Sequence, residues 1–285
     1  MSKIEPSALT TCRSDVTNGA TRVYFIIGDP IAQVRSPASV TAQLREAGKN
    51  AIVVPAHVRP ADLKAFLAGI GPLDNVDGII ATVPHKFSVL EFCDSLGSEA
   101  QSVGAANVLR RGAKGRWRGD MFDGIGMVRA LAGAGFTADG KRALLLGAGG
   151  AGTAISHALV SAGIGAVAIF DPDHDRRERL TDALNERSRA RAIAWSESDG
   201  VGTFDLLVNA SSIGLRENDP APIDLAGAQQ SIFIADVITG RVTPLVAQAR
   251  DRGYATVTGD QMFDEVCLCM FAQVCARMVS FFLHD

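Results

Sequence analysis

The sequence predicts an α/β protein of two domains, of which the second has the doubly wound, Rossmann-type topology. The length of 285 residues corresponds to two domains of roughly 150 residues each. Short apolar runs alternate with stretches of helical periodicity along the chain, which indicates sheets of mostly parallel strands. A glycine-rich turn follows an apolar run at 144–152, where a strand of such a fold gives way to a helix.

The first half of the chain alternates strands with helices. Ser36-Pro37 is typical of a helix start, because proline fits the first helical position, and Pro84 is expected to open another helix. Glycines at 112–115 predict a turn between two short strands. The predicted strands are 23–27, 51–54, 78–82, 106–109 and 117–118, and the predicted helices are 36–48, 60–70 and 84–96.

The second half begins near Asp123 and repeats the alternation. The predicted strands are 142–146, 167–170, 192–195, 204–209, 232–236 and 256–257, and the predicted helices are 124–135, 151–163, 175–187, one from Pro244, and 261–282. We expect a first domain at 1–119, with 1–20 as a flexible extension, and a second domain at 120–260. The last helix, within 261–285, is expected to return to the first domain.

Composition excludes several classes of function. The formal net charge is −3, so there is no excess of basic residues to bind a nucleic acid. Apolar stretches end well short of about 18 residues and the N-terminus is polar, so neither a membrane span nor a signal peptide is expected. The five cysteines are odd in number and lack the spacing of a zinc site, which predicts free thiols, no metal and a cytoplasmic protein.

The segment from Leu144 to Gly152 predicts a dinucleotide site. Gly147 would permit the tight turn, Gly149 would let backbone approach a pyrophosphate, and Gly152 would let helix and strand pack closely. The helix start would offer free N–H groups to the anion. Asp171 ends the next strand and would accept hydrogen bonds from ribose hydroxyls and repel a 2′-phosphate, so NAD is expected rather than NADP.

Other interpretations of this segment stay open. The glycines could form a turn that binds nothing, and Asp171 could be an exposed turn residue. Arg176 and Arg177 could also accept a phosphate, in which case NADP would be the cofactor.

Lys86 and Asp123 are candidates for proton transfer. Lys86 follows a strand end, where ligands of open α/β sheets bind, and would lie in the first turn of a helix. A cation is disfavoured there by the helix dipole, which suits a lysine that exchanges protons. Asp123 lies at the junction of the two domains, although it could simply cap a helix, and Lys86 could be an ordinary surface lysine. His85 is either a second proton donor or a solvent-facing residue near the cap.

Several motifs in order resemble the shikimate/quinate dehydrogenase family over nearly the whole chain from Tyr24. They begin at Gly28-Asp29-Pro30-Ile31-Ala32 and Ser36-Pro37 and continue with Thr82-Val83-Pro84-His85-Lys86, Gly104-Ala105-Ala106-Asn107, 119–124, 147–152, 209–214 and Thr243-Pro244. The resemblance implies that the first domain binds the substrate and the second binds NAD. It implies reversible hydride transfer from a ring hydroxyl of shikimate, quinate or a related cyclic hydroxy acid.

The resemblance also implies roles for individual residues. Lys86 and Asp123 would be catalytic, and Ser36, Thr82, Asn107 and Asp123 would bind the substrate. The residues implied in cofactor binding are Gly147, Gly149, Gly150, Ala151, Gly152, Asp171, Asn209, Ser211, Val237 and Gly259. A homodimer is the assembly we expect, with the oligomeric state left open.

The chain departs from the family pattern at positions that would meet the substrate. Val34 and Ile80 replace a serine and an asparagine, Val266 replaces a glutamine, and a tyrosine expected after Asp236 is missing. The pocket therefore suits a different or less polar ring acid, unless Gln33 or Arg35 compensates. Two alternatives stay open: a sensor that binds NAD or a metabolite with little turnover, and another Rossmann enzyme such as an NADP-linked reductase.

Overall fold

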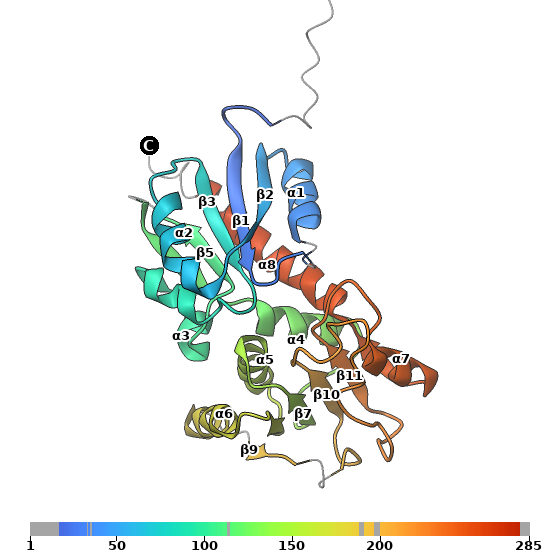
Figure 1. The fold of residues 1–285 in the computed structure, drawn as a ribbon. Coiled ribbons are helices and arrows are strands. Elements are labelled where there is room, and N and C mark those ends of the chain that lie inside the picture. The colour runs from blue at the N-terminus through green and yellow to red at the C-terminus, as the bar shows by residue number, and fades with distance from the viewer. Residues whose placement is uncertain are drawn as a thin grey trace, which may run out of the picture.

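The computed structural model describes residues 17–32, 34, 36–112, 115–187, 191–196 and 200–279. Its two sheets lie one beyond the other along the length of the molecule (Figure 1). Residues 1–16 of the predicted N-terminal extension lie outside the described residues.

The first sheet is mixed and has the strand order β2-β1-β3-β5-β6-β4. Its strands are β1 (Arg22–Gly28), β2 (Ala51–His57), β3 (Val76–Ala81), β4 (Ser95–Leu96), β5 (Val108–Arg111) and β6 (Trp117–Asp120). β1 pairs in parallel with β2 and β3, while β5 pairs antiparallel with β3 and β6. The antiparallel pair arises because β5 and β6 are joined by the predicted glycine turn rather than by a helix. The helices of this half are α1 (Ser36–Glu46), α2 (Leu63–Ile70) and α3 (Ser98–Val103).

The second sheet is parallel and has the order β12-β11-β10-β7-β8-β9. Its strands are β7 (Arg142–Leu146), β8 (Ala166–Phe170), β9 (Arg191–Ala194), β10 (Leu206–Asn209), β11 (Phe233–Asp236) and β12 (Ala255–Val257). Its helices are α4 (Asp123–Gly133), α5 (Gly150–Ser161), α6 (His174–Arg187) and α7 (Pro244–Asp251). The chain runs outward from β7 to β9 and then crosses to β10, which opens a ligand-binding crevice between β7 and β10.

Apolar side chains fill both faces of this second sheet. Leu145 lies in the core on one face with Ile155 of α5, whereas Leu144 lies in the core on the other face with Leu245 of α7. A parallel strand buried on both faces needs such a continuous apolar run, which is why 144–146 is Leu-Leu-Leu.

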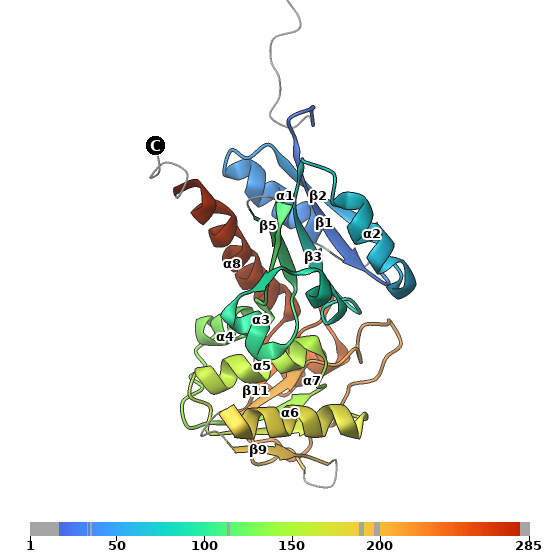
Figure 2. The same ribbon diagram turned by 90° about the vertical axis from the view of Figure 1, so that its left-hand side faces the viewer.

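The last helix, α8 (Gly259–Val279), leaves the second sheet and runs along the first (Figures 1 and 2). It crosses α4 so closely that a Cβ on Gly126 would lie 3.0 Å from the Met262 carbonyl oxygen. Ile80 of β3 and Val108 of β5 pack against the core cluster that contains Val266 of α8. The predicted return of the C-terminal helix is therefore confirmed, while the residue boundaries of the domains stay a prediction.

The predicted helix after Pro84 is wrong. Residues 83–87 form turns, and only a five-residue 3-10 helix, η2 (Ser88–Phe92), follows. The carbonyl oxygen of Lys86 accepts a hydrogen bond from Ala106 N at 2.8 Å. It therefore pairs with a distant segment and not with an N–H group of a following helical turn. The argument that a helix dipole acts on Lys86 therefore does not apply.

Candidate functional site

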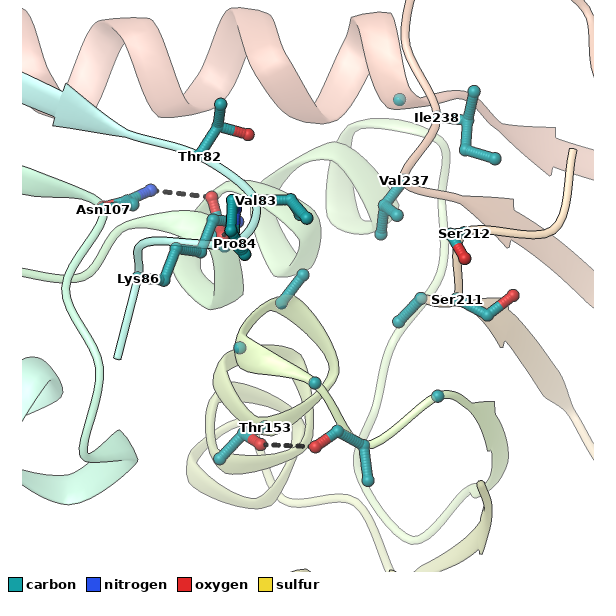
Figure 3. Close-up of a pocket in the computed structure, with 18 of the residues that line it drawn as sticks. Thr82, Val83, Pro84, Lys86, Asn107, Thr153, Ser211, Ser212, Val237 and Ile238 are labelled. Carbon is teal, nitrogen blue, oxygen red and sulfur yellow. Dashed lines mark hydrogen bonds and ion pairs between the residues drawn. The ribbon is translucent and has the colours of Figure 1, made fainter. Parts of the chain in front are cut away.

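A cleft of about 1360 Å³ lies between the two sheets and is lined by residues of both. The turn after β3, with Thr82 and Lys86, forms one side of it, and the loops after β10 and β11, with Ser211 and Val237, form the other (Figure 3). Helix α8 passes over the top of this view. The cleft opens at the carboxyl ends of the strands, where ligands of open α/β sheets bind.

Lys86, Asp123 and Asn107 form one hydrogen-bonded group in the cleft. Figure 3 shows Lys86 and Asn107 on the same side of it. Lys86 Nζ lies 2.5 Å from Asp123 Oδ2, and Asn107 Nδ2 donates to Asp123 Oδ1 at 2.7 Å. The side chains of the ion pair are only 14% and 9% exposed, so water screens them weakly. The three residues, to which the family resemblance assigns catalysis and substrate binding, thus lie in one place, while those roles stay a prediction.

Asn107 is the residue that fixes the group in place. Its backbone N–H donates to Asp120 O at 3.0 Å, and its side-chain oxygen accepts from Phe122 N at 3.0 Å. Its carbonyl accepts from Ala81 N at 2.8 Å, which ties it to β3. Because Asp123 is the first residue of α4, the same asparagine orients both the carboxylate and the start of that helix.

The glycine-rich turn faces the group from the second sheet. Gly147 has φ +102°, a conformation that favours glycine, and a Cβ on Gly152 would overlap the Gly147 carbonyl oxygen. A Cβ on Gly149 would meet no protein atom within 4 Å, so this glycine leaves backbone open to the cleft. The N–H groups at the start of α5 and this open backbone fit an anionic pyrophosphate.

Gly150 lies next to the lysine. A Cβ on it would come within 3.2 Å of Lys86 Cδ and 3.7 Å of Phe87 Cε2. The turn that would hold a dinucleotide therefore lies in contact with the side chain proposed to move the proton.

Asp171 is buried at the end of β8, and its carboxylate is already used within the protein. Its Oδ2 accepts from Ala148 N at 2.7 Å, and its Oδ1 accepts from Asp173 N at 2.9 Å. Arg176 NH1 lies 3.7 Å from Oδ2, and both Arg176 and Arg179 line this end of the cleft. The Asp171 carboxylate is thus hydrogen-bonded to the glycine turn, and the Arg176 guanidinium lies next to it.

The remaining predicted cofactor residues divide into two sets. Ala151, Ser211, Val237 and Gly259 line the cleft, whereas Gly152 and Asn209 lie behind its surface. The side chain of Ser36 lies outside the described residues, as do Gln33 and Arg35.

Asn209 belongs to a buried network that supports the loops of the second sheet. Its side-chain oxygen accepts from Ser211 Oγ at 2.7 Å, and its Nδ2 donates to Asp236 Oδ2 at 3.2 Å. Thr243 Oγ1 donates to the same Asp236 oxygen at 2.7 Å. Burial raises the pKa of the Asp236 carboxyl, and these hydrogen bonds together with Ile238 N oppose that rise.

His85 is neither a proton donor in the cleft nor a solvent-facing residue. It is 1% exposed, and its Nε2 lies 2.7 Å from the carbonyl oxygen of Val58. The expectation of a solvent-facing side chain was wrong because the turn at 83–87 points His85 into the first domain and leaves Lys86 and Phe87 at the cleft.

Helix α8 contributes more to the cleft than the sequence indicated. Val266 was expected to meet the substrate, but Met262 and Met270, which are also buried, line the cleft beside it and were given no such place. Phe87, 48% exposed at the rim, was also missed, although it directly follows the lysine of the motif.

Within the described residues, no helix is long and apolar enough to cross a membrane, and no group of His, Cys, Asp or Glu side chains could hold a metal ion. Cys93, Cys267 and Cys269 are free thiols, and burial raises the pKa of Cys93 to about 11 and that of Cys267 to about 12. Cys12 and the side chain of Cys275 lie outside the described part of the chain.

Known proteins resemble both the sequence and the fold. A family model described as the shikimate dehydrogenase substrate binding domain matches residues 26–109. The shikimate dehydrogenase (NADP(+)) of Geobacter sp. (strain M21) is 33% identical over 249 residues, 85% of each chain. The solved shikimate dehydrogenase of Aquifex aeolicus superposes with TM-score 0.83 at 27% identity, over 90% of this chain and 93% of that one.

The expectation of NAD is contradicted by these comparisons. The curated relatives from Geobacter, Rhodospirillum rubrum and Methanopyrus kandleri are all named as NADP(+) enzymes. The Thermus thermophilus structure, with TM-score 0.77 and 27% identity over 88% of this chain and 92% of that one, is a complex with NADP(H) and shikimate. The inference failed because it took the Asp171 carboxylate to be free for ribose, whereas that carboxylate binds the glycine turn and has Arg176 beside it.

Proposed function

Since the chain belongs to the shikimate dehydrogenase family of oxidoreductases, which act on CH–OH groups, we propose that it oxidises a ring hydroxyl of a cyclic hydroxy acid with NADP as the acceptor. Shikimate and quinate are the first substrates to test. The observation that carries the proposal is the Lys86–Asp123–Asn107 group, which faces the glycine-rich turn across one cleft.

Lys86 is the proton carrier in this proposal. When hydride leaves the ring carbon, the hydroxyl becomes a carbonyl and its proton must go to a base within hydrogen-bond reach. Lys86 Nζ in its neutral form takes this proton, and as an ammonium it returns the proton to the carbonyl oxygen in the reverse reaction. The Asp123 carboxylate, at 2.5 Å, stabilises the ammonium that forms, because uptake of the proton turns a negatively charged pair into a neutral one.

Thr82 and Asn107 hold the substrate next to the lysine. The Thr82 side chain lies on the cleft beside α8, and the Asn107 amide lies beside the ion pair (Figure 3). Their task is to orient the reacting carbon, because correct placement of the reacting atoms supplies a large part of enzymatic rate enhancement. Ser36 stays a prediction as a further substrate contact.

The second sheet holds the cofactor. The Gly147–Gly150 turn and the α5 N-terminus would bind the pyrophosphate, and Arg176 would meet the 2′-phosphate of NADP. Bound NADP supplies the carbon that accepts the hydride. The opposite side of the cleft would enclose the nicotinamide end of the cofactor. It is lined by Ser211, Val237 and Gly259.

The proposal is tested by NADPH formation with purified full-length protein. Shikimate and quinate are each offered with NADP and, in parallel, with NAD. We expect turnover of a ring acid with NADP and a much lower kcat/KM with NAD. Binding of NADP and of the ring acids without turnover would contradict the proposal and favour a sensor with the same fold.

A further inference from the structure

One wall of the cleft, here called the apolar wall, consists of Val34, Ile80, Met262 and Val266. Ile80 links the two parts of this wall. Like Val34, it packs against the core cluster of Ile26, Leu44, Ala51 and Val53, and it also packs against the cluster that contains Met262 and Val266. The wall therefore brings together apolar side chains from the loop after β1, strand β3 and helix α8.

The apolar wall lies directly beside the proposed catalytic group. Ile80 is two residues before Thr82 on the chain that leads to Lys86. Val266 packs on Gly126, one helical turn beyond Asp123 on α4, where a Cβ would overlap the Val266 side chain. A ring whose reacting hydroxyl contacts Lys86 is thus bounded on one side by this wall.

The two sides of the cleft offer different chemistry to a ring. Lys86, Asn107, Asp123 and Thr82 provide donors and acceptors for hydroxyl groups. The apolar wall provides none, so a hydroxyl that faces it loses its hydrogen bonds to water without replacement. Each such hydroxyl lowers kcat/KM by about ten-fold or more. A CH₂ group at the same place instead strengthens binding, because apolar surface is removed from water.

We propose that the substrate is a cyclic hydroxy acid whose hydroxyl groups are confined to the edge that faces Lys86, Asp123 and Asn107, and whose opposite edge is hydrocarbon. This inference rests on the proposed function and specifies its substrate class. A densely hydroxylated ring acid such as shikimate is then a poor substrate compared with a ring acid that carries a single hydroxyl.

The test compares two acids that share the reacting position. Shikimate carries several ring hydroxyls, whereas 3-hydroxycyclohex-1-ene-1-carboxylate keeps only the hydroxyl next to the double bond. With full-length protein and NADP, we expect kcat/KM to be about ten-fold or more higher for the monohydroxy acid. Equal values, or a preference for shikimate, would overturn the inference and leave the proposed function standing. Oxidation of neither of these acids, nor of quinate, would overturn both.

Variants of the apolar wall test the cause of the preference. Ile80→Asn adds a hydrogen-bonding group on the β3 part of the wall, and Val34→Thr adds a hydroxyl with little change of shape on the loop after β1. Each is expected to shift the ratio of kcat/KM toward shikimate by about ten-fold. Ile52→Asn on β2, which does not line the cleft, is the matched control and should leave the ratio unchanged.

The outcomes of the variant experiment are distinct. Val34→Thr keeps the test decisive if Ile80→Asn does not fold, because its side chain is nearly isosteric with the native one. A ratio that is the same in native protein and in folded wall variants would overturn the inference. A shift of the same size in Ile52→Asn would also overturn it, since the wall would then not be the cause.

Discussion

The substitution Lys86→Met tests whether Lys86 acts in proton transfer and not in the binding of NADP. Methionine keeps most of the length of the side chain but has no group that can take up or release a proton. Proton transfer by a placed side chain contributes about 100- to 10,000-fold to rate, so kcat for the ring acid should fall by this factor. The NADP site would keep its contacts, because the glycine turn and Arg176 are untouched.

The same substitution is also expected to lower the free energy of unfolding, because Asp123 loses a partner. Asp123 would keep its 2.7 Å hydrogen bond from Asn107 but lose the ammonium at 2.5 Å, with its side chain 9% exposed. A charged group that loses one partner in such a place destabilises the protein by about 1–3 kcal/mol. The cleft is open to water, which keeps the cost below that of a fully enclosed carboxylate.

Steady-state NADPH formation, NADP titration and denaturant unfolding measure these three quantities. Lys64→Met on α2 is the matched control, since Lys64 is exposed and does not line the cleft. It should change neither kcat nor the free energy of unfolding. Turnover of Lys86→Met close to that of the native protein, with NADP still bound, would refute the role of the lysine.

Three further predictions concern the glycines and the cofactor. Gly150→Ala should lower kcat by about ten-fold, because its Cβ would lie 3.2 Å from Cδ of Lys86, the proposed proton carrier, whereas Gly149→Ala should mainly raise KM for NADP. Arg176→Ala should raise KM for NADP by about ten-fold and leave KM for NAD unchanged; equal effects on both would contradict contact with the 2′-phosphate. In unfolding experiments, Gly124→Ala should destabilise by about 1–3 kcal/mol through overpacking of α4 on α5, whereas Gly133→Ala on the same helix has open space and should stabilise by about 0.5–1 kcal/mol. Equal effects of these two substitutions would show that helix propensity, not packing, decides.

The cofactor choice illustrates the limit of a sequence motif. The position of Asp171 after a strand indicated which residue would lie at the ribose end of the site. It did not indicate what the carboxylate would bind, because one of its two partners, Ala148 N, lies 23 residues away in the sequence and meets it only when the two loops fold together. Arg176, five residues further on, reaches the same place through α6.

Features that depend on neighbouring residues can be predicted from the order of the amino acids alone. The strand, glycine turn and helix at 142–161 could be predicted because each follows from apolar periodicity and from glycine conformation within a few residues. The order of the motifs placed Lys86, Asn107 and Asp123 in one family pattern, although it gave no distance between them.

Only the tertiary structure decided the features that depend on contacts between distant segments. Lys86 meets Asp123 across 37 residues of sequence. The turn at Lys86 replaces a helix because its carbonyl oxygen binds Ala106 N instead of a neighbour in the local chain. The apolar wall exists because α8 returns to lie beside β3, so that Ile80, the last residue but one of that strand, packs against the cluster that contains Val266. Such contacts carry no signal in local periodicity, since the energy that forms them comes from packing rather than from nearby residues.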